Sequence, residues 1–110
     1  MNERDPLHIE RMQDEIDFLE KNLIDVSKEE FIQNSILQRA IAMSLINIGE
    51  CAHRLSDNFR EENAYIEWGE IIATRNIAAH GYWQLKMELV WDTVKEDVPR
   101  LRKFLDEVSI

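Results

Sequence analysis

The chain has 110 residues, a net charge of −9 and 45% hydrophobic residues. This length suits one domain, so residues 1–110 are expected to fold as a single unit around one modest core. Gly and Pro are scarce, with 3 and 2 residues, and Asn-Gly or Gly-Gly hairpin signals are absent. An all-α domain is therefore predicted, and the acidic balance excludes a non-specific nucleic-acid coat, which needs a basic face.

The content of cysteine and apolar residues limits the class of protein further. Cys51 is the single cysteine, which excludes an intrachain disulfide, and its apolar surroundings favour an inert core thiol. Zinc-ligand spacing of Cys and His is absent, so neither a metal nor a cofactor is expected. The start of the chain is too charged for a signal peptide, and no apolar run could span a membrane. We expect a soluble cytoplasmic protein without membrane contact.

The first predicted helix covers about residues 6–23. Asp5 is a favourable N-cap, and Pro6 suits the first helical position. Acidic residues cover most of this helix and are interpreted as a solvated face. The apolar residues recur at steps of three and four and form one stripe: Ile9, Met12, Ile16, Leu19 and Leu23.

A second, long helix is predicted from about residue 28 to 55, because Ser27 and Glu30 have the spacing of a capping box. A ragged polar stripe interrupts its apolar surface, formed by Arg39, Asn47, Glu50 and Arg54. An internal Glu50–Arg54 ion pair would explain the stripe structurally, since buried charges are usually paired. The functional alternative is that the stripe lines a cavity or supports catalytic residues.

The second half of the chain predicts two more helical regions. One begins between residues 64 and 68 and ends at Ala79 or His80, because Gly81 tolerates the left-handed conformation that ends helices. The other runs from Met87 towards the C-terminus, and Pro99 predicts a kink near residues 95–99. Short connections indicate an antiparallel bundle of four to five helices.

Residues 75–83 collect most of the reactive side chains. Arginine can grip phosphate, and histidine can exchange a proton near neutral pH. Arg75 and His80 are about 140° apart on an ideal helix, so a site that uses both needs an unwound terminal turn or a second copy of the chain. The structural alternative makes His80 a C-terminal cap, Arg75 a surface ion-pair partner, and Tyr82 and Trp83 packing aromatics.

The pattern Arg75-x-x-x-x-His80 at the end of a helix is similar to the signature of HEPN-domain ribonucleases. With Asn76 and Tyr82 added, it resembles the HepT-type toxins of the type VII HepT/MntA toxin–antitoxin systems. The likeness covers nearly the whole chain and includes Asp5-Pro6, residues 46–50, Trp68 with Ile71-Ile72, Val90-Trp91 and residues 97–99.

This resemblance implies a HEPN-like homodimer with a composite active site between the protomers, and metal-independent cleavage of RNA. Arg75 would stabilise charge on the scissile phosphate. His80 would act as general base or acid during attack by the neighbouring 2′-OH, which leaves a 2′,3′-cyclic phosphate. Asn76 would orient the site, and Glu50 and Arg39 of the polar stripe would support it.

The resemblance also implies a partner protein. A minimal nucleotidyltransferase antitoxin of the MntA type would attach AMP to Tyr82 and block the site by charge and volume. Two other functions stay open: a non-catalytic helical partner or scaffold of a nucleotidyltransferase, and an accessory domain that binds small nucleotides. Trp68, Trp83 and Trp91 are interpreted as residues of the core or of a dimer interface.

Overall fold

The computed structural model describes residues 2–109, and their side chains except those of residues 77–79 and 82. Within this part the chain is helical and has no β-strand, which confirms the all-α prediction. The elements are α1 (Asp5–Leu23), α2 (Lys28–Gln33), α3 (Ser35–Arg54), α4 (Asp57–Glu62), α5 (Trp68–Ala79), the 3₁₀ turn η1 (Tyr82–Gln84), α6 (Met87–Asp92), the π-helical turn η2 (Thr93–Asp97) and α7 (Val98–Val108).

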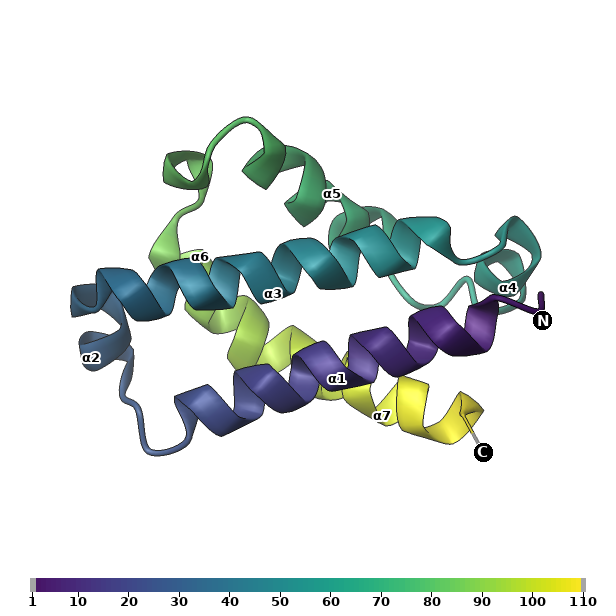
Figure 1. The fold of residues 1–110 in the computed structure, drawn as a ribbon, viewed down its shortest axis with the longest axis horizontal. Coiled ribbons are helices and arrows are strands. Elements are labelled where there is room, and N and C mark those ends of the chain that lie inside the picture. Colours follow the sequence, from purple (N-terminus) through teal and green to yellow (C-terminus); the bar gives the residue numbers. More distant parts are fainter. Residues whose placement is uncertain (1, 110) are drawn as a thin grey trace.

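The longest helix, α3, packs against both α1 and α5. α1 lies along α3 and runs antiparallel to it, α5 packs on α3, and α7 packs against α1 (Figure 1). The predicted apolar stripe of α1 is confirmed, because each of its five residues is at most 3% exposed. None of the helices in the described part is both long and apolar enough to cross a membrane.

The start of α1 differs from the prediction. Asp5 is the first helical residue, and Arg4 is the N-cap, without a side-chain capping bond. The buried Asp5 carboxylate accepts hydrogen bonds from the Ser56 N–H at 2.8 Å, the Ser56 hydroxyl at 2.6 Å and the Asn2 N–H at 2.8 Å. Burial alone would raise the pKa of Asp5, but these bonds outweigh it, so the pKa is lowered. Asp5 therefore joins the start of α1 to the turn between α3 and α4.

The single helix predicted over residues 28–55 is wrong, because Asn34 divides it into α2 and α3. The capping box is confirmed: the Glu30 N–H donates to the Ser27 hydroxyl at 3.1 Å, and the Ser27 N–H donates to the Glu30 carboxylate at 3.2 Å. Asn34 has an extended backbone and caps α3 with its side-chain oxygen. The Gln38 amide donates to carbonyls at the end of α2, which offsets the break.

The last helical region is interrupted where Pro99 predicts it. α6 continues into the π-helical turn η2, and α7 begins at Val98 with Pro99 in its first turn. Pro99 has no N–H to donate to the preceding turn, and the Val98 N–H donates to the carbonyl of Thr93, five residues back, in the π-helical turn that comes before the proline. The helix is therefore irregular just before Pro99, over Thr93–Asp97, and the kink itself stays a prediction.

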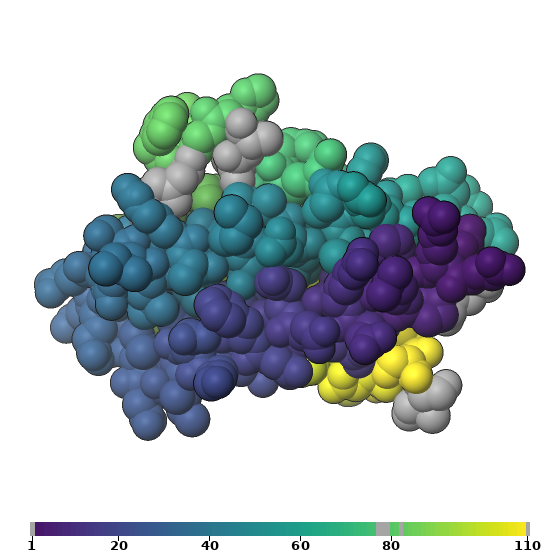
Figure 2. Space-filling view, in the orientation of Figure 1, coloured from purple at the N-terminus to yellow at the C-terminus, as the bar shows by residue number. Residues whose placement is uncertain are grey.

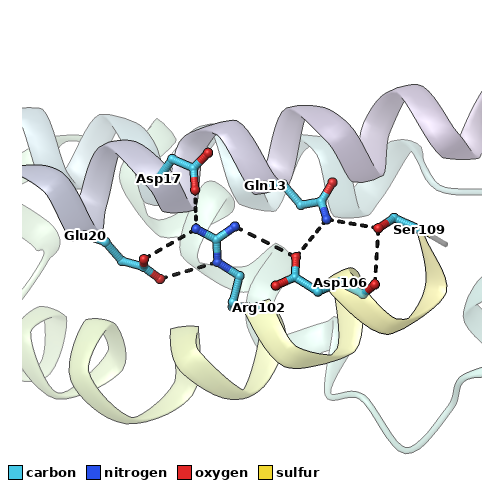
Figure 3. Close-up of polar contacts among 6 residues, drawn as sticks. All are labelled: Gln13, Asp17, Glu20, Arg102, Asp106 and Ser109. Carbon is cyan, nitrogen blue, oxygen red and sulfur yellow. Dashed lines mark hydrogen bonds and ion pairs between the residues drawn. The ribbon is translucent and has the colours of Figure 1, made fainter.

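A polar cluster around Arg102 fastens α7 to α1 (Figure 3). The Arg102 guanidinium pairs with Asp17 and Glu20 of α1 and lies 3.9 Å from the Asp106 carboxylate. The Gln13 amide of α1 also donates to Asp106, at 2.9 Å. The acidic face of α1 is solvated as predicted, but it also contributes contacts that hold α7 in place.

Candidate functional site

The crossing of α3 and α5 depends on Gly49. A Cβ built on Gly49 would lie 2.9 Å from the Arg75 Cβ and 2.9 Å from the Ile71 carbonyl oxygen. Real Cβ atoms hardly ever make contacts this short, so only glycine fits here without a shift of α5. The close approach places Arg75 beside Glu50, the residue that follows Gly49.

Glu50 binds two arginines, one with each carboxylate oxygen. Its Oε2 pairs with the Nε of Arg75, and its Oε1 accepts a hydrogen bond from the Nε of Arg54 at 2.9 Å. The bond from Arg54 is the main reason why the pKa of Glu50 is lowered, and Arg75 adds to it against the opposing effect of burial. The predicted Glu50–Arg54 pair is confirmed but is not internal, since the two side chains are 35% and 60% exposed.

Arg75 makes a second contact within its own helix. Its Nη1 donates to the side-chain oxygen of Asn76 at 3.1 Å. Glu50 and Asn76 thus hold the guanidinium from two sides, which defines its plane. The side chain is 32% exposed, so a ligand in solution can still reach it. The structure therefore brings three predicted site residues together: Arg75, Asn76 and Glu50.

His80 follows directly after the last residue of α5 and is exposed. Gly81 has φ +132°, which confirms it as the predicted helix stop. A Cβ at Gly81 would also come within 2.5 Å of the Trp83 ring, but that ring is exposed and could move, so the backbone conformation is the reason for glycine here. Tyr82 opens η1, but its side chain, to which the modification prediction applies, lies outside the described residues.

Two other members of the predicted polar stripe lie elsewhere. One is far from Arg75 along α3, and the other contacts α1. Arg39 is exposed on α3, about three turns before Glu50. Asn47 donates to the Glu15 carboxylate of α1 at 3.0 Å, so it belongs to the α1–α3 contact. Asn47 and Glu50 lie three residues apart on the same helix, so the predicted stripe stays a prediction, with Asn47 turned towards α1.

The tryptophans divide into two groups. Trp68 is buried, and its indole N–H donates to the Asn63 carbonyl at 3.1 Å. Trp91 is half-buried and packs on Phe31 with ring centroids 5.5 Å apart. Both are core residues, as predicted, whereas Trp83 is 78% exposed and does not belong to the core. A role for Trp83 in a dimer interface stays a prediction.

Gly49 is the residue of this site that sequence reasoning missed. A glycine inside an otherwise apolar helix was the available signal, since it often marks a close approach of two backbones. Metal binding has no support in the part of the chain that the structure describes, because no three His, Cys, Asp or Glu side chains there could share an ion.

Comparison with known proteins is consistent with this geometry. The family model described as ribonuclease HepT-like matches residues 12–108. A protein named "Putative RNase" from Caldanaerobacter subterraneus subsp. tengcongensis is 31% identical over 92% of this chain and 90% of its own length. Another of that name, from Methanocaldococcus jannaschii, is 36% identical over 76% of this chain and 77% of its own.

A protein named "Probable ribonuclease HepT" from Thermococcus cleftensis is 27% identical over 86% of both chains. No solved structure gives a significant match. The family match covers both the helix that carries Glu50 and the segment from Arg75 to Tyr82. With its all-helical fold and this match over most of its length, the chain belongs to the ribonuclease HepT-like family.

Proposed function

We propose that this protein is an endoribonuclease that cleaves RNA with Arg75 and His80. The observation that carries the proposal is the orientation of Arg75, whose guanidinium is held by Glu50 and Asn76 in a member of a ribonuclease family. Guanidinium has five N–H donors in a planar fork, so two contacts leave donors for a phosphate. An arginine oriented in advance stabilises the charge that builds on phosphorus without first having to reorganise.

The proposed reaction uses a nucleophile that RNA itself supplies. One histidine takes the proton from a 2′-OH, whose oxygen attacks the adjacent phosphorus, and the P–O5′ bond breaks as the leaving oxygen gains a proton. The products are a 2′,3′-cyclic phosphate and a free 5′-OH. Arg75 stabilises the added charge on the phosphoryl oxygens. Because the nucleophile belongs to the substrate, this mechanism needs no metal-bound water.

This reaction needs both a base and an acid, and we propose that a homodimer supplies them as two copies of His80. A twofold axis doubles each residue of a self-complementary surface. Ile36 and Met43, seven residues apart on one face of α3, are 81% and 55% exposed, and Trp83 is 78% exposed. The exposed apolar pair on α3 is a candidate contact surface for a second copy of the chain, which supports this dimer.

We further propose that the protein is the toxin of a toxin–antitoxin pair and acts on RNA in the cytoplasm. A separate MntA-like nucleotidyltransferase would attach AMP to Tyr82, two residues after His80. The added phosphate would repel an RNA phosphate, and the adenosine would occupy the substrate's volume. The motif position of Tyr82 supports this step. The mass of the protein co-expressed with the enzyme tests it: an unchanged mass, or AMP on another residue, rejects it.

The catalytic proposal is tested by RNA digestion in the presence of EDTA. Wild type is expected to give cyclic-phosphate ends, and His80→Ala and Arg75→Ala are expected to give none. Arg75→Lys keeps the charge but loses the Nε contact with Glu50, so it is also expected to be impaired. The control is His53→Ala, which removes another exposed histidine, on α3. Cleavage that persists in both His80→Ala and Arg75→Ala contradicts the proposal, and absence of cleavage by wild type favours the scaffold alternative.

A further inference from the structure

A cavity of about 300 Å³ lies between α3, α5 and the start of α7, whose arrangement can be followed in Figure 1. Pockets that take small molecules have volumes of about 300–1,000 Å³, so this cavity is large enough for a small ligand. α1 and α3 cover the face of the molecule drawn in Figure 2, and none of the described residues of α1 lines the cavity. Arg75 and His80 do not line it either, so it is separate from the candidate catalytic residues.

The floor of the cavity is apolar. Leu45 and Ile48 of α3 and Val98 of α7 are each at most 5% exposed. A ligand that covers this floor with hydrocarbon gains about 25 cal/mol for each Å² of apolar surface removed from water. The apolar residues that line the cavity are Leu45, Ile48, Ile66, Ile71, Val98 and Leu101.

Exposed carboxylates stand on two walls of the cavity mouth. Glu67 directly precedes α5 and Glu70 lies in its first turn, whereas Asp97 belongs to the other wall, where η2 leads into α7. The ion pairs between described residues involve none of these three side chains. The pKa of Glu70 is raised by a hydrogen bond with Glu67 and by the negative charges of Glu67 and Asp97. A cation at the mouth would relieve this repulsion.

Two further side chains shape the mouth. Arg100 is the one cation among the described residues that line it, so carboxylates outnumber guanidinium groups and the mouth is negative. Tyr65 adds an aromatic ring that is 73% exposed and packs edge-to-face on Phe104, with centroids 5.8 Å apart. Aromatic faces attract cations, so Tyr65 acts in the same direction as the carboxylates.

We infer that this cavity binds an aliphatic diamine or polyamine, with its hydrocarbon chain on the apolar floor and its ammonium groups at the carboxylates of the two walls. A hydrated metal ion would gain nothing from the floor, and no three described His, Cys, Asp or Glu side chains are placed to share one. A neutral apolar molecule would leave the carboxylates without a partner. The inference goes beyond the proposed ribonuclease activity and does not depend on it.

A ligand in this cavity would contact the helix that carries the candidate catalytic arginine. Ile71 lines the cavity, and its carbonyl oxygen lies at the crossing with Gly49 of α3. Arg75 follows Ile71 by one turn on α5. A bound diamine would therefore add contacts between α5 and α7, and it is expected to raise the melting temperature as its concentration exceeds the Kd.

The test titrates the full chain with cadaverine, a five-carbon diamine, and follows the backbone amides by heteronuclear NMR. About 0.1 M salt is used, because it screens charges more than about 10 Å apart. Shifts are expected at Glu67, Glu70, Thr93 and Asp97. Pentylamine has the same chain but one ammonium group, so it is expected to bind about two- to fivefold more weakly. Ethylenediamine lacks most of the chain and is expected to bind roughly tenfold more weakly.

Variants of the mouth test the charges one at a time. Glu70→Gln and Asp97→Asn are each expected to weaken cadaverine binding by about two- to fivefold, and Arg100→Gln to strengthen it by about as much. The matched controls are Glu96→Gln and Lys103→Gln, which change the net charge equally at exposed positions outside the cavity and are expected to bind as wild type does. The carboxylates also lie at helix starts, so melting temperatures without ligand record any loss of stability.

Stronger binding by Arg100→Gln is the decisive result, because a loss of fold cannot produce it. No binding of cadaverine, shifts confined to the acidic face of α1, or equal losses in Glu70→Gln and Glu96→Gln overturn the site. Equal affinity for pentylamine overturns the bridge between the two walls. Tighter binding of N-acetyl-lysine methylamide than of cadaverine would assign the cavity to a lysine of a partner protein and overturn the free diamine. RNA cleavage plays no part in these measurements, so either proposal can fail while the other stands.

Discussion

Gly49 of α3 and Arg75 of α5 touch where the two helices cross, with room for a hydrogen atom on Gly49 but not for a methyl group. The contact brings the Arg75 backbone onto α3 one residue before Glu50, which binds the Arg75 side chain. One residue without a side chain thus sets both the distance between two helices and the place of the candidate catalytic guanidinium.

Gly49→Ala is expected to destabilise the fold by about 1–3 kcal/mol, because the new methyl group must displace α5 or strain it. RNA cleavage should fall as well, since the displacement moves Arg75 relative to Glu50. Denaturant unfolding and the cleavage rate measure the two effects. Gly69→Ala is the control: a Cβ there has no neighbour within 4 Å, so the change should be neutral or stabilising by up to about 1 kcal/mol. Wild-type behaviour of Gly49→Ala would show that the crossing tolerates a side chain.

Glu50→Gln is expected to slow RNA cleavage on the order of tenfold to a hundredfold, because Arg75 loses the charge that orients it. The pKa of Glu50 is lowered, so its ion pairs stabilise the fold fully above the ordinary value of 4.5 and are lost as the pH falls through the folded pKa. The difference in unfolding free energy between wild type and variant should therefore shrink below pH 4.5. Glu10→Gln, on the exposed side of α1, should show neither effect.

Asp5→Asn is expected to cost about 1–3 kcal/mol, because an amide NH₂ replaces one of the oxygens that accept from Ser56 and Asn2. The pKa of Asp5 is lowered from 3.8, so wild type should lose this stabilisation as the pH falls from 3.8 through the folded pKa. The variant should lack that step in a plot of unfolding free energy against pH. If both proteins lose stability in parallel below pH 3.8, the Asp5 network is not what stabilises the junction.

As the pH falls, protonation of His8 should cost wild type a further part of its stability, in a pH range above that of the Asp5 step. Its pKa is lowered from 6.5, chiefly by burial, so the neutral form is the one that fits the fold. This contribution is present above pH 6.5 and is lost as the pH falls through the folded pKa. His8→Gln should remove this step and leave the Asp5 step in place. A His8→Gln curve that follows the wild-type curve from pH 7 to 5 would contradict the assignment.

Cys51 is expected to be unreactive in the folded protein. Its side chain is buried, and burial raises the pKa of its thiol, so little thiolate forms. Labelling with iodoacetamide should proceed only after denaturant unfolds the protein, at the rate of unfolding. Rapid labelling of native protein would show that the end of α3 opens locally.

Local spacing was enough to predict much of the fold. The apolar stripe of α1, the Ser27–Glu30 capping box and the stop at Gly81 each depend on residues within a few positions of one another, and all three are confirmed. The motif from Arg75 to Tyr82 also indicated the family that the comparisons identify. Such features follow from backbone geometry and side-chain chemistry over one or two helical turns.

Two features that the sequence did not predict depend on contacts between residues far apart in the chain. Asp5 was predicted to be an N-cap, but its carboxylate accepts hydrogen bonds from Ser56, which is 51 residues away in the sequence. The break at Asn34 is an exception, because its contacts are local: Asn34 caps α3, and Gln38 donates to carbonyls at the end of α2. The pairing of Glu50 with Arg75 depends on a helix crossing at Gly49, and such a crossing is decided by which faces pack in the folded chain. Contacts between distant segments have no periodic signal, so only the packed structure could reveal them.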